Sequence, residues 1–380
     1  MSNFFVERPQ EFAEIAKYLS DRELFQLTQV YPKLLDNSTF WSARFQSSTQ
    51  RTLSKFRCLS MGESYFARMA MINDTTIYEV GYLKIIKYIL ETLMLTPTTN
   101  QINHAAIYGP IDVVKYLFGK GLIPDQYGIN QTARKGRIDI IEYLSNSIQP
   151  NEYGANMAVS NGYYDLVKYL AERFEVYPNI DGLNDAVETG NFTAVKYYIQ
   201  HYDMSPEISS VDMAAEYGKF DIIRYLNEKL NILPSEDGLE GAVGTGQMDL
   251  VKYLVDRGMI PNDRGAFFAA RNGYLDMVRY LLEDLKMTLS DSIINAGTDT
   301  GQIEVIRYLV SKGFKPTVYT ANLAACRAQD EVVQYLIENF GIRPNIDGAN
   351  LAARRRHAEV IRYCVEELGF TLQENKFVSH

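Results

Sequence analysis

The sequence predicts an all-α protein, a helical solenoid of about ten to eleven short repeats preceded by a small helical module. Three observations support this fold class. A motif of an acidic residue, two apolar residues, Lys or Arg, Tyr and Leu returns along most of the 380 residues. Apolar residues within each unit follow helical spacing, and glycine and proline recur at fixed places. The motif tyrosines are spaced by 26–28 residues, at Tyr88, Tyr116, Tyr143, Tyr169, Tyr197, Tyr225, Tyr253, Tyr280, Tyr308, Tyr335 and Tyr363.

The first half of each unit predicts a short, closely packed helix. The residue eleven before the tyrosine is small, as at Ala105, which lets neighbouring helices approach. The residue seven before it is glycine in nine units, and Ala328 and Arg356 take its place in the last two. Because glycine adopts the left-handed conformation without a Cβ penalty, we expect it to end this helix.

The second half of each unit predicts a longer, buried helix. An acidic residue such as Asp112 lies four before the tyrosine, in the first turn, where the helix dipole favours it. Apolar residues such as Val113, Val114 and Leu117 cover a broad face, which is typical of a helix packed on both sides. A proline follows, as at Pro124, and turns the chain.

The run Ala-Ala-x-x-Gly-x-Ile-Asp-Val-Val-Lys-Tyr-Leu at 105–117 resembles the ankyrin repeat, and the resemblance covers about 290 of the 380 residues. It implies pairs of antiparallel helices. The period of about 33 in that family exceeds the spacing here, so we expect its hairpin fingers to be short or absent. An asparagine row, including Asn103 and Asn130, replaces the family's Thr-Pro-Leu-His opening. We expect this row to form a structural hydrogen-bond ladder to backbone groups.

The first 45 residues lie outside the repeat register. Phe12, Ile15 and Leu19 share one helical face, and Leu24 and Leu27 share a second one. This spacing predicts three or four short helices. Such a module buries little apolar area alone and requires a partner or a neighbouring domain to complete its core.

The run from Tyr18 to Phe45, with Leu19, Glu23 and Trp41 at matching spacing, resembles an F-box. In that family the helices bind the Skp-type adaptor of a cullin–RING ubiquitin ligase. The resemblance implies that Phe12, Ile15, Leu19, Leu24 and Leu27 contact the adaptor. The opening departs from the family, because Arg8 stands where proline is usual. The alternative is a helical cap that shields the first repeat.

The expected domains are the F-box-like module at 1–45, a linker and capping helix at 46–76, the repeats at 77–370 and a tail at 371–380. The beginning of the chain lacks the pattern of a signal peptide, and no apolar run is long enough for a membrane span. Three scattered cysteines indicate a reducing compartment. We therefore expect a monomer in the cytoplasm, with the nucleus as an alternative, and no membrane contact.

No motif for catalysis or cofactor binding is present in the sequence. The four histidines and three cysteines have no metal-ligand spacing, and the glycines match no phosphate-binding loop. The repeated carboxylates each occupy the same helical position, which fits dipole stabilisation rather than acid–base chemistry. The net charge of −9 argues against general nucleic-acid binding. We expect no enzyme activity, no cofactor and no metal.

Recognition is expected at the two positions that the motif leaves free, nine and eight before each tyrosine. In an ankyrin-like stack the first helices line the concave side, so these residues would face a groove that holds an unidentified protein target. The alternative for each is a solvated position without a partner. The candidates are Tyr108, Arg134, Lys135, Glu188, Glu216, Tyr217, Arg271, Asn272, Arg327, Arg354 and Arg355.

The two resemblances together predict a substrate receptor of an SCF-type ubiquitin ligase, which holds its target in the repeat groove. An F-box joined to such tyrosine-rich repeats is similar to the F-box/ankyrin proteins of large DNA viruses that infect amoebae, for which the compartment would be the host cytoplasm. The alternative is a binding scaffold or decoy without a ligase connection, in which the N-terminal helices serve only as a cap.

Overall fold

The computed structural model describes residues 75–366 except 82 and 93, together with 369, 371–373 and 376–378. The F-box-like module expected at 1–45, with its five candidate adaptor contacts, lies outside the described residues, as does nearly all of the expected linker at 46–76. The described chain is the helical solenoid that the periodicity predicts. It divides into two compact units, Met1–Gly182 and Leu183–His380, and each is described by itself.

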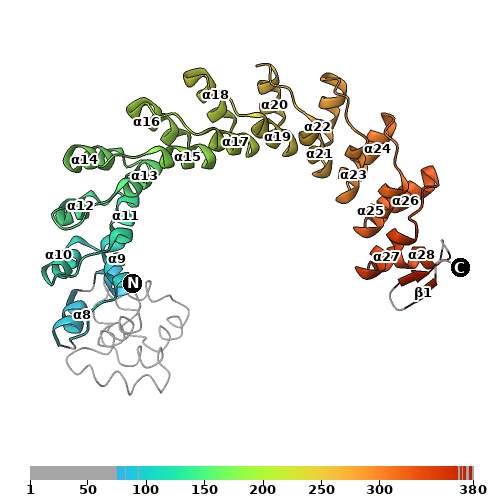
Figure 1. Cartoon of the computed structure of the whole chain (residues 1–380). Helices are drawn as coiled ribbons and strands as arrows, with labels where there is room; N and C mark the ends of the chain where they lie inside the picture. Colours follow the sequence, from blue (N-terminus) through green and yellow to red (C-terminus); the bar gives the residue numbers. More distant parts are fainter. Residues whose placement is uncertain are drawn as a thin grey trace, which may run out of the picture. The chain divides into compact units, whose positions relative to one another are not determined.

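The described residues contain eleven helix pairs, one for each motif tyrosine. Within each unit, Figure 1 shows the first helices of the pairs side by side in one row and the second helices in another. The first helices are α7 (Thr76–Val80), α9 (Thr99–Tyr108), α11 (Gln126–Arg134), α13 (Glu152–Ser160), α15 (Ile180–Thr189), α17 (Ile208–Glu216), α19 (Glu236–Gly244), α21 (Asp263–Arg271), α23 (Ser292–Asp299), α25 (Val318–Cys326) and α27 (Ile346–Arg354). The second helices are α8 (Leu83–Lys87) with the π-helical turn η2 (Tyr88–Thr92), α10 (Ile111–Gly119), α12 (Ile138–Leu144), α14 (Tyr164–Phe174), α16 (Phe192–Tyr202), α18 (Phe220–Leu230), α20 (Met248–Val255), α22 (Leu275–Arg279) with η3 (Tyr280–Asp284), α24 (Ile303–Ser311), α26 (Asp330–Phe340) and α28 (Ala358–Glu366).

The core lies between the two rows and between successive pairs. Val113, Val114 and Leu117 on α10 are at most 3% exposed. The small residue of the first helix is also buried in every pair from α9 to α27, as at Ala105. Within each unit, neighbouring first helices pack directly on one another, for example α9 on α11 in the first and α17 on α19 in the second. A larger side chain at the small position would push these helices apart, because interiors are packed without spare volume.

The turn between the two helices of a pair has left-handed backbone, as predicted. Eight of the nine motif glycines have positive φ, and Ala328 (φ 57°) and Arg356 (φ 60°) adopt the same conformation without being glycine. Gly109 is the exception, with φ −76°. It precedes Pro110, which disfavours helical backbone in the residue before it. Gly109 is required for a different reason, since a Cβ there would lie 2.4 Å from the carbonyl oxygen of Tyr78.

The asparagine row forms the expected ladder between successive repeats. Asn130 accepts a hydrogen bond from the backbone N–H of Asn151 at 3.1 Å and donates through Nδ2 to the Oδ1 of Asn151 at 2.9 Å. Asp212 plays the same part, accepting from both the N–H and the hydroxyl of Ser235 at 2.6 Å. The backbone bond is also made in the pairs Asn103–Asp125, Asn156–Asn179, Asn184–Glu207 and Asn322–Asn345. Each bond joins one first helix to the residue just before the next first helix.

The Lys or Arg that precedes the motif tyrosine forms a second ladder, which the periodicity alone does not predict. In six of the described repeats its cation lies over the tyrosine ring of the following repeat. The guanidinium of Arg307 is 4.6 Å from the centroid of Tyr335, and that of Arg279 is 5.1 Å from Tyr308. Lys87–Tyr116, Lys115–Tyr143, Lys196–Tyr225 and Lys252–Tyr280 repeat the contact at 5.5–5.8 Å. These cation–π contacts stabilise the row of second helices.

Two tyrosines of this row also bind a carboxylate of the preceding repeat. Glu283 in η3 accepts from the hydroxyl of Tyr308 at 3.0 Å and pairs with Lys312 at 2.8 Å. The pKa of Glu283 is lowered by its hydrogen bond with Lys312 first and by Tyr308 second. Burial, followed by this hydrogen bond, raises the pKa of Tyr308 to about 12. Glu91, Tyr116 and Lys120 repeat the arrangement beside η2.

The loop after each second helix accounts for the variable period. The tyrosine-to-proline interval is 7–9 residues, whereas each proline lies 19 residues before the next tyrosine. The second helix usually ends at a left-handed residue, as at Gly121 (φ 77°) or Glu175 (φ 56°). Between consecutive repeats of residues 94–357 these loops contain no strand, in agreement with the short period. The loop prolines are buried, as is Leu289, which replaces one of them.

A two-stranded hairpin follows the last helix, in the segment expected to be a tail. Strand β1 (Thr371–Gln373) pairs antiparallel with β2 (Lys376–Val378), with Leu372 opposite Phe377. Strand β2 packs against α27. The hairpin therefore covers part of the last first helix, which has no following repeat to do so.

Candidate binding surface

The eleven candidate groove residues lie at or just after the C-terminal ends of first helices, on α9, α11, α15, α17, α21, α25 and α27. Tyr108 and Tyr217 are about half exposed, at 48% and 57%. Arg134, Lys135 and Glu216 are exposed as well. The motif therefore identified one end of a strip that is mostly exposed, although Ile107 and Gly244 at the ninth position are buried.

The structure extends that strip by two positions, sixteen and twelve residues before the tyrosine. The twelfth position lies one turn before the candidates and the sixteenth lies two turns before them, on the same side of the helix. We call the four positions together the first-helix face. Tyr127 (63% exposed) and Tyr319 (65%) occupy the sixteenth position. Other large exposed side chains at these positions are Tyr153, Met213, Phe268 and Leu351.

The sequence analysis missed these apolar side chains because an exposed Tyr or Phe in a helix has the same letter as a buried one. A signal was present in their spacing. Tyr127 and Tyr153 are 26 residues apart, at one position of successive repeats. Arg134, at a position that the motif leaves free, lies seven residues after Tyr127 on the same helix. A stripe at intervals of three, four and seven residues marks one helical face.

In the first unit the face is aromatic and basic. The ammonium of Lys135 lies 5.4 Å from the ring centroid of Tyr108, so these two candidates contact each other across α9 and α11. The centroid of the His104 ring lies 5.4 Å from that of Tyr108. His104 also contacts a carboxylate oxygen of Glu79 at 2.7 Å. Tyr108 thus contacts Lys135 and His104 and still exposes about half of its surface to solvent.

In the second unit several candidates bond to neighbouring repeats. Glu188 accepts a 2.8 Å hydrogen bond from the hydroxyl of the buried Ser210. Asn272 donates to the carbonyl of Gly244 at 2.8 Å, and Arg355 donates to a backbone carbonyl of α25 at 3.2 Å. These three side chains therefore help to join repeats, a role that the sequence analysis did not assign to them.

Two basic candidates share one carboxylate. Asp299 lies between Arg271 and Arg327, with N–O distances of 3.3 and 2.6 Å. The side chain of Asp299 is only 16% exposed. The ion pairs join α21, α23 and α25, and the single carboxylate offsets one of the two positive charges. Arg354 and Arg355 at the end of the stack remain exposed.

A notch of about 420 Å³ interrupts the face at α19. It arises because α19 has Gly241 and Gly244 at the twelfth and ninth positions, where the flanking repeats have large side chains. Two candidates, Glu216 and Asn272, lie on its rim. The other lining residues are Asp237, Glu240, Thr245, Arg264 and Phe268. We refer to this hollow as the α19 notch.

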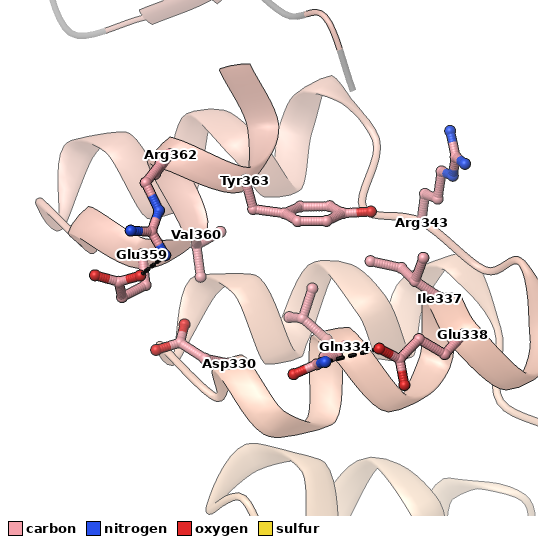
Figure 2. Close-up of a pocket in the computed structure, with 10 residues that line it drawn as sticks. Asp330, Gln334, Ile337, Glu338, Arg343, Glu359, Val360, Arg362 and Tyr363 are labelled. Carbon is pink, nitrogen blue, oxygen red and sulfur yellow. Dashed lines mark hydrogen bonds and ion pairs between the residues drawn. The ribbon is translucent and has the colours of Figure 1, made fainter. Parts of the chain in front are cut away.

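A second cavity, of about 440 Å³, lies between the second helices α26 and α28 and includes none of the candidates. Figure 2 shows Val360 and Ile337 between the charged side chains that line it. Gln334 points toward Glu338, to which it donates at 2.7 Å. Gln334 occupies the position at which most other repeats have Lys or Arg. The last cation–π contact of the ladder described above is that of Arg307 with Tyr335, which lies on α26 beside this cavity.

The described residues contain neither a metal-ligand cluster nor a membrane-spanning helix. No group of three or more His, Cys, Asp or Glu side chains there is placed to hold a metal ion. None of the described helices combines the length and the hydrophobicity needed to cross a membrane. What the described geometry offers is an extended, varied surface on a regular framework.

Comparison with known proteins bears on the second unit. Residues 266–348, which span α21 to α27, match the family model for ankyrin repeats in three copies. This stretch contains ankyrin repeats. The helix pairs before it share the same motif and the same ladder, so the ankyrin-like framework extends beyond the matched residues. Ankyrin repeats support a role in protein–protein interaction.

Solved structures give only distant matches. A crystal structure of the pentatricopeptide repeat protein PPR10 in complex with an 18-nt psaJ RNA element is 12% identical, with a TM-score of 0.32. The match covers 98% of this chain and 67% of that one. PPR10 from maize, also 12% identical, gives a TM-score of 0.30 over 92% of this chain and 72% of that one. These scores carry no argument about function. No curated protein matches the sequence significantly.

Proposed function

We propose that this chain is a non-catalytic binding protein that holds a protein target on its first-helix face. The observation that carries the proposal is the contrast between framework and face. Framework positions repeat from unit to unit, whereas the face presents different side chains on each helix, including exposed aromatics such as Tyr127, Tyr217 and Tyr319. Exposed aromatic residues are enriched at the energetic centres of protein interfaces.

We further propose that the target is held for ubiquitination in the cytoplasm. This step rests on the F-box-like run in the first 45 residues, which would bind a Skp-type adaptor through Leu19, Leu24 and Leu27. In this arrangement the repeats select the target and the N-terminal module recruits the ligase. The α19 notch and the aromatic face supply selection, and no residue of this chain performs chemistry.

The adaptor interaction is tested by co-purification of the intact chain with a Skp-type adaptor. We expect a stable complex that is lost in the double variant Leu24→Asp plus Leu27→Asp, because two charges on an apolar contact face remain unpaired. Leu351→Asp is the matched control. It places the same charge at an exposed position of α27 and leaves adaptor binding intact.

The outcomes separate the ligase receptor from a scaffold. If the intact chain does not bind the adaptor, or if the double variant binds as well as the wild type, the ligase role is wrong. The chain would then act as a binding scaffold or decoy, with the N-terminal helices as a cap. Far-ultraviolet circular dichroism of the double variant verifies that the repeats remain folded.

A further inference from the structure

We propose that the α19 notch binds one basic side chain, an arginine or a lysine, from a segment of the partner protein. The inference rests on the proposed protein-binding function and adds the chemistry of one contact. Three features of the notch carry it: its shape, its unbalanced charge and its aromatic wall.

The shape is that of a socket for a single side chain. At the twelfth position of the repeat, Met213 and Phe268 stand on either side of Gly241. At the ninth position, Glu216 and Arg271 stand on either side of Gly244. Neighbouring groups already approach both glycines. A Cβ on Gly241 would lie 3.0 Å from the Cβ of Glu216, and one on Gly244 would lie 2.8 Å from the Cβ of Phe268. The absence of two side chains therefore creates a hollow with close walls.

The charge of the notch is negative. Its lining contains three carboxylates, from Glu216, Asp237 and Glu240, and one guanidinium, from Arg264. Arg264 already serves two of the carboxylates through Nη1, at 2.9 Å from Asp237 and 3.1 Å from Glu240. Among the described residues, the exposed carboxylate of Glu216 has no hydrogen bond or ion pair. The notch therefore attracts a second cation and repels acidic or phosphorylated groups.

Glu240 provides a buried acceptor that this structure leaves incompletely satisfied. The residue is 8% exposed. Its Oε1 accepts a hydrogen bond from the amide of Asn262. Its Oε2 is buried and has no hydrogen bond, since the nearby Arg264 contact is an ion pair that lacks hydrogen-bond geometry. Buried carboxylate oxygens are normally hydrogen-bonded, so an acceptor in this state favours an arriving N–H donor.

Phe268 supplies the third feature, an aromatic wall that is 37% exposed. A long aliphatic stem can pack on this ring while its charged end reaches the carboxylates. A cation close to an aromatic ring gains a further electrostatic attraction. Arginine and lysine combine such a stem with a positive end. A short or purely apolar side chain would leave the carboxylates without a new partner.

The test uses the intact chain and a displayed library of random twelve-residue peptides as the probe. Enriched peptides are synthesised with a fluorescent label, and their affinities are measured by fluorescence anisotropy at two salt concentrations. We expect the enriched peptides to share one Arg or Lys. Replacing it with Gln should weaken binding by about tenfold or more, the equivalent of ~1.4 kcal/mol.

Three variants locate the binding site on the chain. Glu216→Lys should weaken the selected peptides by about tenfold or more, because it reverses the uncompensated charge. Glu228→Lys is the matched control. It makes the same change at an exposed position of α18, in the same repeat but in the other row of helices, and should leave the affinity unchanged. Tyr319→Ser alters the first-helix face two repeats after the notch-lining helix α21.

The variants distinguish failure of this inference from failure of the proposed function. If binding responds to Tyr319→Ser but not to Glu216→Lys, or if the peptides share no basic residue, the proposal that the α19 notch binds a basic side chain is wrong. The first-helix face would still bind protein. If no peptide is enriched, or if binding is insensitive to both Glu216→Lys and Tyr319→Ser, the binding role of the face is wrong as well.

Discussion

The asparagine ladder can be tested at one step by replacing Asn130 with alanine. Asn130 is 4% exposed and exchanges two hydrogen bonds with Asn151, of 2.9 and 3.1 Å. It also accepts a bond from Gln126 at 3.1 Å. The variant removes the amide that joins α11 to the residue preceding α13, while the small alanine still fits between the helices.

The expected loss follows from these contacts. Each intramolecular hydrogen bond contributes about 0.5–1.5 kcal/mol, so the two bonds to Asn151 are worth about 1–3 kcal/mol. Alanine is a better helix former than asparagine, and this difference in helix propensity offsets at most ~0.7 kcal/mol of the loss. We therefore expect the free energy of unfolding to fall by about 1–2 kcal/mol. Gln131→Ala, on the same helix but outside the ladder, should change it by no more than about 0.5 kcal/mol.

Urea unfolding followed by circular dichroism measures the loss, and hydrogen exchange of the Asn151 amide shows where it occurs. Exchange of that amide should accelerate in Asn130→Ala and remain unchanged in Gln131→Ala, because only the first variant removes its acceptor. If the two variants are equally stable and the Asn151 amide exchanges as in the wild type, the ladder does not stabilise the stack and the reasoning is refuted.

Two further predictions concern the turns and the tyrosine row. Ala328→Gly should raise the free energy of unfolding by about 1 kcal/mol, measured by urea unfolding. Left-handed backbone costs alanine about 1–2 kcal/mol, and the greater unfolded-state entropy of glycine offsets part of the gain. The reverse change, Gly301→Ala, should lower it, because φ is 75° and the added Cβ would meet a side-chain oxygen of the next repeat. The raised pKa of Tyr308, about 12, favours its protonated form in the folded state. Its contribution to stability is therefore complete below the unfolded pKa of about 10 and is lost as pH rises toward 12. The free energies of unfolding of the wild type and of Tyr308→Phe should follow parallel pH curves below pH 10. Above pH 10 the curves should diverge, because only the wild type loses the contribution of the Tyr308 hydroxyl. Curves that stay parallel at all pH values would contradict the assignment.

Much of the framework could be read from the sequence because it repeats. A residue that recurs at one position of ten or eleven units must serve a need common to all of them. The buried Ala105, the left-handed Gly136 and the hydrogen-bonding Asn130 each follow from that reasoning, whereas the left-handed backbone of Ala328 was not predicted. Gly109 is an exception because Pro110 favours extended backbone in the residue before it. A glycine is needed there because a Cβ would clash with the carbonyl oxygen of Tyr78.

The binding face could be predicted only in part. Tyr108, Glu216 and Tyr217, at the two free positions of the motif, are exposed at the ends of first helices, and their part in binding stays a prediction. The contacts of these residues with neighbouring repeats could not be predicted. A contact such as that of Glu188 with Ser210 depends on which side chain of the next repeat lies opposite. The same limit applies to the first 45 residues, for which the adaptor contacts remain a prediction.

The sequence by itself determined the repeating helix pair, its length and its turns, since local spacing of apolar, glycine and proline residues decides these. Only the tertiary structure decided which side chains of successive repeats meet. It placed six of the motif Lys and Arg side chains over the next tyrosine ring, as Arg307 over Tyr335. It also turned Gly241 and Gly244, which read as ordinary small residues, into a notch lined by carboxylates. Those features depend on residues about 28 positions apart, and they become neighbours only when the repeats stack.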